Sequence, residues 1–408
     1  MYINRFLTDS LEEILDLFNS ILLLGPRQVG KSTLIKELLN SRKEKVISYK
    51  LQNPQDLYEI HSSPGIITKR VELEVKTNQV ILFIDEIQKC PELLDECQYL
   101  IDEYKNKLKV ILTGSSARKL KRKGINLLPG RVIVENLHTL ILPEILKQSE
   151  QLILPVKNKL LNPTLSKIDL KEILLFGLLP GVFKSPSLKG KILKSYITTY
   201  LEEEIRQEAL TRNMSAFAKF LELSALESNR VLNFSHISSD SGIPVNTVKN
   251  YFHILEDTLI TFSIPPFTAK TRKQVLSTPK YIYFDTGVKN AIINSFPDKK
   301  NLHPEQAGKL FEEFVILELI KRIKYHYPSY KYSYWRTNQG IEIDFIIQTP
   351  KEIIPIEIKY TKVSSESHIK HLKIFMDEFN VNRGFLIGDF RSPHMISKNI
   401  TAIPWNYI

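Results

Sequence analysis

Cysteine and long apolar runs are scarce in this sequence. Of the 408 residues, 2 are cysteines, Cys90 and Cys97, which we expect on one helix. They belong to no cluster of cysteine and histidine residues with zinc-ligand spacing, so the sequence predicts neither a zinc motif nor a disulfide framework. No apolar run is long enough to span a bilayer, and the first residues lack the apolar core of a signal peptide. We therefore expect a cytoplasmic protein with free thiols and no membrane segment.

The composition is that of an ordinary globular protein with an excess of positive charge. Hydrophobic residues make up 43% and charged residues 25% of the chain, which is enough for normal cores. The formal net charge of +11 favours an anionic partner such as nucleic acid or an acidic membrane face. A basic protein that is merely soluble is the alternative. The length is typical of two or three domains, and we place them at residues 1–145, 146–265 and 266–408.

The first of these domains alternates short apolar strands with helical patterns. This alternation is typical of an α/β fold with a parallel sheet and helices on both of its faces. The expected strands are Ile21–Leu24, Val46–Leu51, Val80–Ile84, Val110–Thr113 and Val132–Glu135.

A phosphate-binding loop is predicted directly after the first strand. The pattern G-x-x-x-x-G-K-S lets backbone N–H groups surround a β-phosphate at the positive end of a helix dipole. Lys31 would reach the β- and γ-phosphates, and the Ser32 hydroxyl would be a ligand of Mg²⁺, so ATP and Mg²⁺ are the expected cofactors. The candidate ATP-binding residues are Gly25, Pro26, Arg27, Gln28, Val29, Gly30, Lys31, Ser32 and Thr33.

Acidic and polar residues at the ends of two further strands complete the expected nucleotide site. Asp85 and Glu86 end the third strand, at the edge where a parallel sheet also places the phosphate loop. Asp85 would hold Mg²⁺, and Glu86 would polarise the attacking water. Thr113 or Ser115 would sense the γ-phosphate, unless both belong to an ordinary hydroxyl-rich turn. Arg131 would stabilise the transferred phosphoryl group, in its own chain or in a neighbouring subunit, unless it is a surface arginine.

A helix-turn-helix pattern occupies about residues 215–260. Two helices are expected to meet at Gly242, with Ser235 and Asn246 as their N-caps. The second helix would turn polar residues outward, as a major-groove reader does, and a basic stretch that ends at Lys280 would contact phosphates like a wing. A structural or protein-binding module is the alternative. The candidate DNA-binding residues are Asn246, Thr247, Lys249, Asn250, Arg272 and Lys273.

Two strands near the end of the sequence alternate apolar and charged residues. Ile343, Phe345 and Ile347 are expected on one face of residues 341–347, with Asp344 on the other. Residues 354–360 alternate in the same way. The alternative is a pair of solvated edge strands, which often carry alternating charges.

Pairing of these two strands would bring together Asp344, Glu357 and Lys359. Two carboxylates can hold Mg²⁺ against a phosphate, and a nearby lysine can orient water. A preceding helix, Lys309–Ile320, would add Glu312. The sequence thus predicts a nuclease-like set made of Glu312, Asp344, Glu357 and Lys359.

The N-terminal motifs resemble the AAA+ superfamily of ATPases, and more closely a prokaryotic group of predicted AAA+ ATPases. The resemblance rests on Gly25–Thr33, Phe83–Gln88, Leu112–Ser116, Gly130–Arg131 and a variant Gly/Pro segment, Phe176–Gly181. It implies an AAA-type core that is followed by a conserved C-terminal domain of unknown function. Because AAA+ relatives often form rings, a homo-oligomer is an expectation. The pattern Glu312, Asp344, Glu357-x-Lys359 resembles the restriction-endonuclease-like fold.

One main hypothesis combines these patterns. The chain is expected to be a Mg²⁺-dependent AAA+ ATPase that couples ATP hydrolysis to action on DNA, with a P-loop parallel-sheet core. A helical, winged-helix-like middle and a restriction-endonuclease-like α/β domain would follow the core. The alternatives are a signalling or regulatory ATPase with a non-catalytic protein- or DNA-binding platform, a metal-dependent nuclease, and a regulator associated with a toxin or a transport system.

Overall fold

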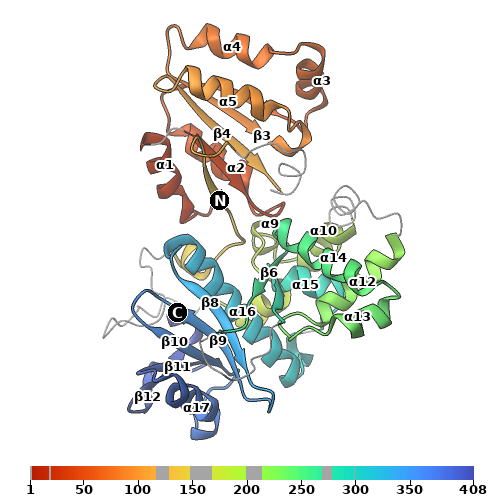
Figure 1. Cartoon of the computed structure of the whole chain (residues 1–408), viewed down its shortest axis with the longest axis vertical. Helices are drawn as coiled ribbons and strands as arrows, with labels where there is room; N and C mark the ends of the chain where they lie inside the picture. Colours follow the sequence, from red (N-terminus) through yellow and green to blue (C-terminus); the bar gives the residue numbers. More distant parts are fainter. Residues whose placement is uncertain are drawn as a thin grey trace. The chain divides into compact units, whose positions relative to one another are not determined.

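The computed structural model describes residues 2–17, 20–115, 128–147, 168–198, 214–268, 278–297 and 299–408. Two compact units contain them (Figure 1): unit 1 is Met1–Thr139 with His253–Ile260, and unit 2 is Leu140–Phe252 with Thr261–Ile408. The basic stretch that was expected to act as a wing includes Lys270, Arg272 and Lys273, which lie outside the described residues. Across the described ranges, every helix is too short or too polar to cross a bilayer.

The sheet of unit 1 consists of parallel strands in the order β2-β3-β4-β1-β5. Each strand pairs in parallel with its neighbours, so the carboxyl ends of β1 and β3 come to the same edge. This result confirms the predicted α/β fold and the expected strands. The bounds are β1 (Ser20–Leu24), β2 (Lys45–Lys50), β3 (Val80–Asp85), β4 (Leu108–Gly114) and β5 (Ile133–Asn136).

Helices cover this sheet because its three central strands, β3, β4 and β1, are mostly apolar and are buried on both faces. One core cluster joins alternate strand residues, such as Leu82 and Leu112, to Val71 and Leu100 of two covering helices. In Figure 1 these two helices, α4 and α5, lie along one side of the strands. The bounds are α1 (Leu7–Leu17), α2 (Lys31–Asn40), α3 (Pro54–Ser62), α4 (Ile66–Glu74) and α5 (Leu93–Glu103).

The two cysteines are both buried in unit 1, but they do not share a helix. Cys97 lies within α5, where burial raises the pKa of its thiol. Cys90 lies earlier, directly after a short 3-10 turn, η1 (Ile87–Lys89). The expectation of one common helix was wrong because Pro91 follows Cys90, and a proline disfavours helical backbone at the residue before it.

Unit 2 begins with short helices. The variant Gly/Pro segment follows α8 and packs tightly: a Cβ atom on Gly177 would lie 1.9 Å from Oδ1 of Asp285, at a φ of +66°. The same Asp285 carboxylate accepts hydrogen bonds from the Leu178 and Val288 N–H groups, so the segment is a packing element of unit 2. The helices are α7 (Leu142–Leu146), α8 (Leu170–Phe176), α9 (Pro180–Phe183), α10 (Lys189–Tyr196), α12 (Met214–Leu226) and α15 (Thr286–Ile292).

The predicted helix-turn-helix consists of α13 (Phe234–Ser241) and α14 (Val245–Asp257), with Gly242 in the turn at a φ of +69°. The expected N-caps were wrong: Asn233 caps α13, and Asn246 already lies inside α14. Helix α14 begins early because Pro244, whose φ is fixed, accepts the first backbone bonds from Thr247 and Val248. An antiparallel pair follows, β6 (Thr261–Ile264) and β7 (Lys280–Tyr283).

The C-terminal sheet has the strand order β12-β13-β11-β10-β9-β8. The sequence predicted two strands, a helix and one strand after the long helix α16, whereas three strands precede α17 and three follow it. Three of the six strands were not predicted: β8, whose residues do not alternate clearly, and two of the three strands after α17. The bounds are α16 (Pro304–His326), β8 (Lys331–Arg336), β9 (Glu342–Gln348), β10 (Ile353–Ile358), α17 (Lys370–Phe379), β11 (Gly384–Gly388), β12 (His394–Ser397) and β13 (Ile400–Pro404).

Strands β9 and β10 are antiparallel neighbours inside this sheet, which rules out the alternative of solvated edge strands. The expected simple alternation on β9 was wrong as well. Ile343 shares a core cluster with Ile346, whereas Phe345 stacks on Tyr332. The β8–β9 register shifts between Ser333 and Trp335, and such a bulge turns the following side chains to the other face.

Candidate nucleotide site and carboxylate cavity

The phosphate loop of unit 1 connects β1 to α2 at the carboxyl edge of the sheet. Gly30 is the N-cap of α2 with a φ of +101°, a left-handed conformation that glycine adopts without strain. Because Gly30 has no side chain to cap the helix, no capping group competes with an anion for the N–H groups of the first turn. This loop fits the phosphates of a nucleotide.

The lysine and the serine of the loop are already placed for this chemistry. The buried Lys31 ammonium donates to the carbonyl oxygens of Gly25 (2.8 Å) and Pro26 (3.1 Å), which folds it over the loop. The Ser32 hydroxyl donates to the Asp85 carboxylate, at 3.1 and 2.9 Å from its two oxygens. A hydroxyl and a carboxylate this close form the oxygen donor set that Mg²⁺ accepts.

Thr113, near the end of β4, contacts both acidic residues of the site. The Thr113 hydroxyl donates to Asp85 and accepts from the Glu86 N–H at 3.1 Å. Glu86 has a φ of +64°, which is uncommon for a residue with a side chain and is typical of a functionally constrained position. Thr113 therefore contacts both Asp85, the expected metal ligand, and Glu86, the expected general base.

Gln88 ends the motif Phe83–Gln88, but the sequence indicated no role for it at the site. Its side-chain amide donates to the Glu86 carboxylate and to the Ser115 hydroxyl, the latter at 2.9 Å. Ser115 thus reaches Glu86 through Gln88, whereas Thr113 contacts the acidic pair directly. Gln88 lies two positions after Glu86, and the sequence around it does not indicate whether its side chain faces the nucleotide site.

Arg5 is a second missed residue. Its guanidinium is buried and donates to the carbonyl oxygens of Val29 and His138, both at 2.7 Å. These bonds tie the phosphate loop to the segment after β5. Arg5 is far from both partners in the sequence, so no sequence motif indicated these contacts.

Arg131 is not brought to the nucleotide site of its own chain. It precedes β5 and forms a two-pronged ion pair with Asp102, with distances of 2.7 and 2.9 Å. Asp102 lies in the last turn of α5, which precedes β4. Arg131 therefore lies at the amino-terminal edge of the parallel sheet, whereas the phosphate loop lies at the carboxyl edge.

A cavity of about 510 Å³ in unit 2 contains all four predicted nuclease-like residues. They reach it from α16 (Glu312), β9 (Asp344), β10 (Glu357) and the residue after β10 (Lys359). Cationic side chains also line the cavity: Arg230, Lys280 and Arg336. The fold thus joins residues that are far apart in the sequence.

The acidic residues of this cavity are held close together. Lys359 Nζ lies 2.7 Å from Glu357 Oε1 and 3.5 Å from Asp344 Oδ2. The same Asp344 oxygen accepts the Ile358 N–H at 2.8 Å, and Asn229 donates to Glu312 at 2.8 Å. The other oxygen of Glu357, Oε2, is buried without a hydrogen-bond partner among the described residues, as expected for an oxygen that a cation can bind.

Burial and crowding change the acidity of these groups. Burial, followed by repulsion from the Asp344 carboxylate, raises the pKa of Glu312 to about 8. The same two causes hold the pKa of Glu357 well above its ordinary value. Burial alone would lower the pKa of Lys359, but the attraction of Asp344 and Glu357 outweighs it and raises the pKa. A divalent cation would relieve the repulsion between these carboxylates, so the residues fit a metal ion.

The candidate DNA-binding residues of α14 are partly as expected. Asn246, Lys249 and Asn250 are exposed, and Thr247 is half-buried. Lys280 was expected on an exposed wing but is buried, with its ammonium paired to Glu342 and 4.9 Å from the ring centre of Tyr334. It lines the carboxylate cavity together with Glu342, the first residue of β9.

Comparison with known proteins assigns three parts of the chain. Residues 18–146 match the family model described as an AAA domain. Residues 167–299 match a domain of unknown function (DUF8612), and residues 307–408 match another domain of unknown function (DUF4143).

Full-length relatives are remote. Uncharacterized proteins of Mycobacterium tuberculosis and Mycobacterium bovis are each 23% identical over 393 residues, which cover 95% of this chain and 80% of theirs. A Walker-type ATPase of Pyrococcus abyssi has 18% identity, covers 71% of this chain and 96% of its own, and gives a TM-score of 0.47. The matched segments identify an AAA-type domain in the N-terminal part of this chain and a DUF4143 domain at its C-terminal side.

Proposed function

We propose that this protein is a Mg²⁺-dependent ATPase of the AAA+ type that couples ATP hydrolysis to action on DNA. The contact between Ser32 and Asp85 carries the first part of this proposal, because it joins the phosphate loop to the acidic strand end. Bound Mg²⁺ would neutralise charge on the phosphates. Side chains and backbone groups of the protein would bind the phosphates, hold the cation and activate the attacking water.

Each group has a defined task in the proposed reaction. The α2 N–H groups and Lys31 bind the phosphates, and Ser32 and Asp85 hold the cation. Glu86 takes a proton from the attacking water, and Thr113 and Gln88 fix the position of Glu86. Arg131 can act only on a neighbouring subunit of a homo-oligomer, since it lies away from the site of its own chain.

ATP turnover, measured with and without duplex DNA, tests the coupling. We expect turnover to depend on Mg²⁺, to rise when DNA is added and to vanish in Lys31→Ala. Turnover that is unchanged by DNA at low salt would support the alternative, a signalling ATPase whose C-terminal part binds proteins.

A second function is favoured by the carboxylate cavity of unit 2: metal-dependent cleavage of a phosphodiester. Asp344, Glu357 and Glu312 would hold the cation, which supplies charge neutralisation and an acidic bound water. Lys359, held by Asp344 and Glu357, can orient the attacking water or the phosphate. This arrangement supports a restriction-endonuclease-like mechanism.

A second cavity of unit 2 supports the proposal that DNA could reach the carboxylates. This cavity, of about 580 Å³, is lined by Lys249 of α14 and by the turn between β8 and β9. The two cavities share Val231 and Arg336. A strand that contacts Lys249 could therefore continue past Arg336 to the carboxylates.

Plasmid incubated with Mg²⁺ or Mn²⁺ tests the second function. We expect cleavage by the natural chain, loss of cleavage in Asp344→Ala and Lys359→Ala, and normal cleavage in the control Asp377→Ala, an exposed residue of α17. Equal cleavage by the natural chain and both cavity variants would show that the residues of this cavity do not catalyse the cleavage. Salt-dependent binding without any cleavage would support a non-catalytic DNA-binding platform.

A further inference from the structure

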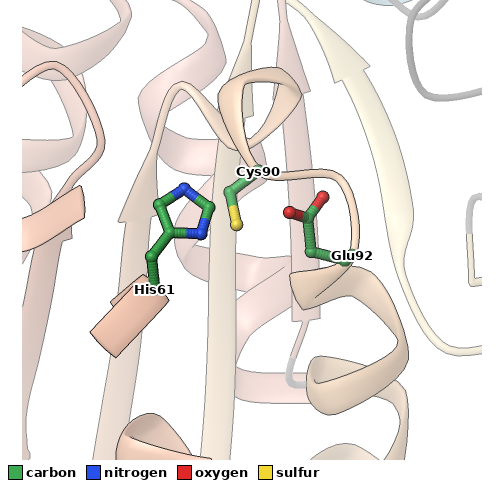
Figure 2. Close-up of side chains that lie close together, drawn as sticks. All are labelled: His61, Cys90 and Glu92. Atoms are coloured by element: carbon green, nitrogen blue, oxygen red, sulfur yellow. The ribbon is translucent and has the colours of Figure 1, made fainter. Parts of the chain in front are cut away.

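Three metal-ligating side chains from separate segments of unit 1 meet at one point. His61 lies in the last turn of α3, Cys90 follows η1, and Glu92 directly precedes α5. One ligand atom from each residue can be chosen so that all three lie within 4.8 Å of one another. Figure 2 shows the sulfur of Cys90 between the His61 imidazole and the Glu92 carboxylate. We propose that His61, Cys90 and Glu92 bind a Zn²⁺ ion.

The chemistry of the three donors favours zinc. A thiolate together with an imidazole selects Zn²⁺ over Mg²⁺ and Ca²⁺, which prefer oxygen ligands. A carboxylate oxygen is an accepted third ligand, and a water molecule would fill the fourth tetrahedral position. This donor set differs from the oxygen-rich sets at Asp85 and in the carboxylate cavity, so its metal preference differs from that of the other two candidate cation sites.

The spacing needs little adjustment. Bonds of about 2.0–2.3 Å to a tetrahedral ion place neighbouring ligand atoms about 3.5 Å apart. His61 and Glu92 are exposed, so their side chains can close this gap by rotation between staggered rotamers. Cys90 is 1% exposed, so its side chain is held in place by the core and the other two ligands would move toward it.

Local structure holds the backbone of all three residues. The Cys90 N–H donates to the Ile87 carbonyl, and the Cys90 carbonyl accepts from Leu93, both at 3.1 Å. Ile60, next to His61, and Cys90 belong to the same core cluster. The α-carbons of the three ligands are therefore set by the fold before an ion arrives, and only side chains have to move.

A bound ion would connect α3 to the segment that carries Asp85 and Glu86. Cys90 follows those residues through the η1 turn, whose Lys89 N–H donates to the Glu86 carbonyl at 2.9 Å. An ion that binds only the folded chain raises its stability by mass action. Zinc would therefore stabilise unit 1 beside its nucleotide site.

Titration of the metal-stripped full chain with Co²⁺, a spectroscopic substitute for Zn²⁺, tests the proposal. A thiolate ligand gives a near-ultraviolet charge-transfer band, whereas the oxygen ligands at Asp85 and in the carboxylate cavity give none. We expect this band to saturate at one Co²⁺ per chain and to disappear when Zn²⁺ is added. A natural chain with no such band at saturating Co²⁺ would overturn the proposal.

Variants identify the ligands. We expect Cys90→Ser to abolish the band, and His61→Ala and Glu92→Gln each to weaken Co²⁺ binding about tenfold or more. The matched control is Cys97→Ala, which removes the other cysteine and should keep the band. His61 and Glu92 are exposed, so their variants test the site without disturbing the core, and circular dichroism confirms that each variant is folded. A band that survives Cys90→Ser, that is lost in Cys97→Ala, or that is unchanged by both exposed variants would contradict this ligand set.

Discussion

Unit 1 and unit 2 each place acidic side chains around a candidate cation site, but with different neighbours. Asp85 of unit 1 is surrounded by hydroxyl groups, from Ser32 and Thr113. Asp344 of unit 2 instead lies among Glu312, Glu357 and Lys359. Neutral donors stabilise a carboxylate without adding charge, whereas crowded carboxylates raise one another's pKa.

The difference suggests how each unit would respond to a cation. In unit 1 the ligands are arranged by hydrogen bonds, so nucleotide and metal enter a prepared site. In unit 2 the ligands repel one another, and metal binding must displace the proton that Glu312, whose pKa is raised to about 8, holds below that pH. Unit 2 should therefore depend on pH more strongly than unit 1.

The largest expected effect is on ATP hydrolysis in unit 1. Glu86→Gln keeps the size of the side chain but removes the base, so we expect turnover to fall by about 10²- to 10⁴-fold with little change in ATP affinity. Steady-state turnover and nucleotide titration measure the two quantities. The control is Glu103→Gln, an exposed residue at the end of α5. Normal turnover in Glu86→Gln would remove Glu86 from the mechanism.

The second effect is the pH dependence of metal binding in unit 2. The pKa of Glu312 is about 8 against an ordinary value of 4.5, so the folded chain holds a proton there between these pH values. A cation must displace this proton, and we expect Mn²⁺ affinity to rise up to about tenfold per pH unit toward pH 8. Electron paramagnetic resonance of free Mn²⁺ measures this slope.

The same group makes a stability prediction with a defined sign. Because the folded state binds the extra proton, the contribution of Glu312 to the free energy of unfolding is present below about pH 4.5 and falls as pH rises toward 8. Glu312→Gln should flatten both the Mn²⁺ slope and this decline, and Glu305→Gln, exposed on the same helix, should change neither. A slope that Glu312→Gln leaves intact would assign the proton to another group.

A smaller effect is expected at Gln88, which joins Glu86 to Ser115 in unit 1. Gln88→Ala removes a hydrogen bond to a carboxylate, and we expect kcat to fall about tenfold while KM stays the same. The control Gln79→Ala lies on the surface of the same unit. A change in KM alone would mean that Gln88 helps to bind the nucleotide and does not position the base.

The smallest effect concerns the exposed face of α14 in unit 2. Lys249→Ala should weaken binding of duplex DNA a few-fold and reduce the salt dependence of log K by about 1, because one phosphate contact is lost. Fluorescence anisotropy at several salt concentrations measures both, with Lys219→Ala on α12 as the control. Identical salt slopes for Lys249→Ala and the natural chain would exclude this residue from the DNA interface.

The nucleotide site was largely predictable from sequence because its residues fall in short motifs at strand ends. Gly30, Lys31 and Ser32 are contiguous, and Asp85 ends an unmistakable apolar strand. The contacts of Arg5 and Gln88 depend on the folded chain, so local patterns could not reveal them.

The second unit was harder to predict, for physical reasons. Asp344, Glu357 and Lys359 were found from alternation and Glu312 from a predicted helix, yet a bulge in the β8–β9 pairing changed the faces of β9. Lys280 looked like an exposed basic residue, and only the fold shows it buried against Glu342. The His61, Cys90 and Glu92 cluster comes from three separate segments and has no sequence spacing that marks it.

Calorimetric titration of the full chain with ATP in the presence of Mg²⁺ shows directly whether unit 1 binds a nucleotide. We expect a saturable heat with one ATP bound per chain, and the loss of this heat in Lys31→Ala. If the natural chain, shown by circular dichroism to be folded, gave no heat at any ATP concentration, unit 1 would not be a nucleotide-binding domain, and the proposed ATPase function would be wrong.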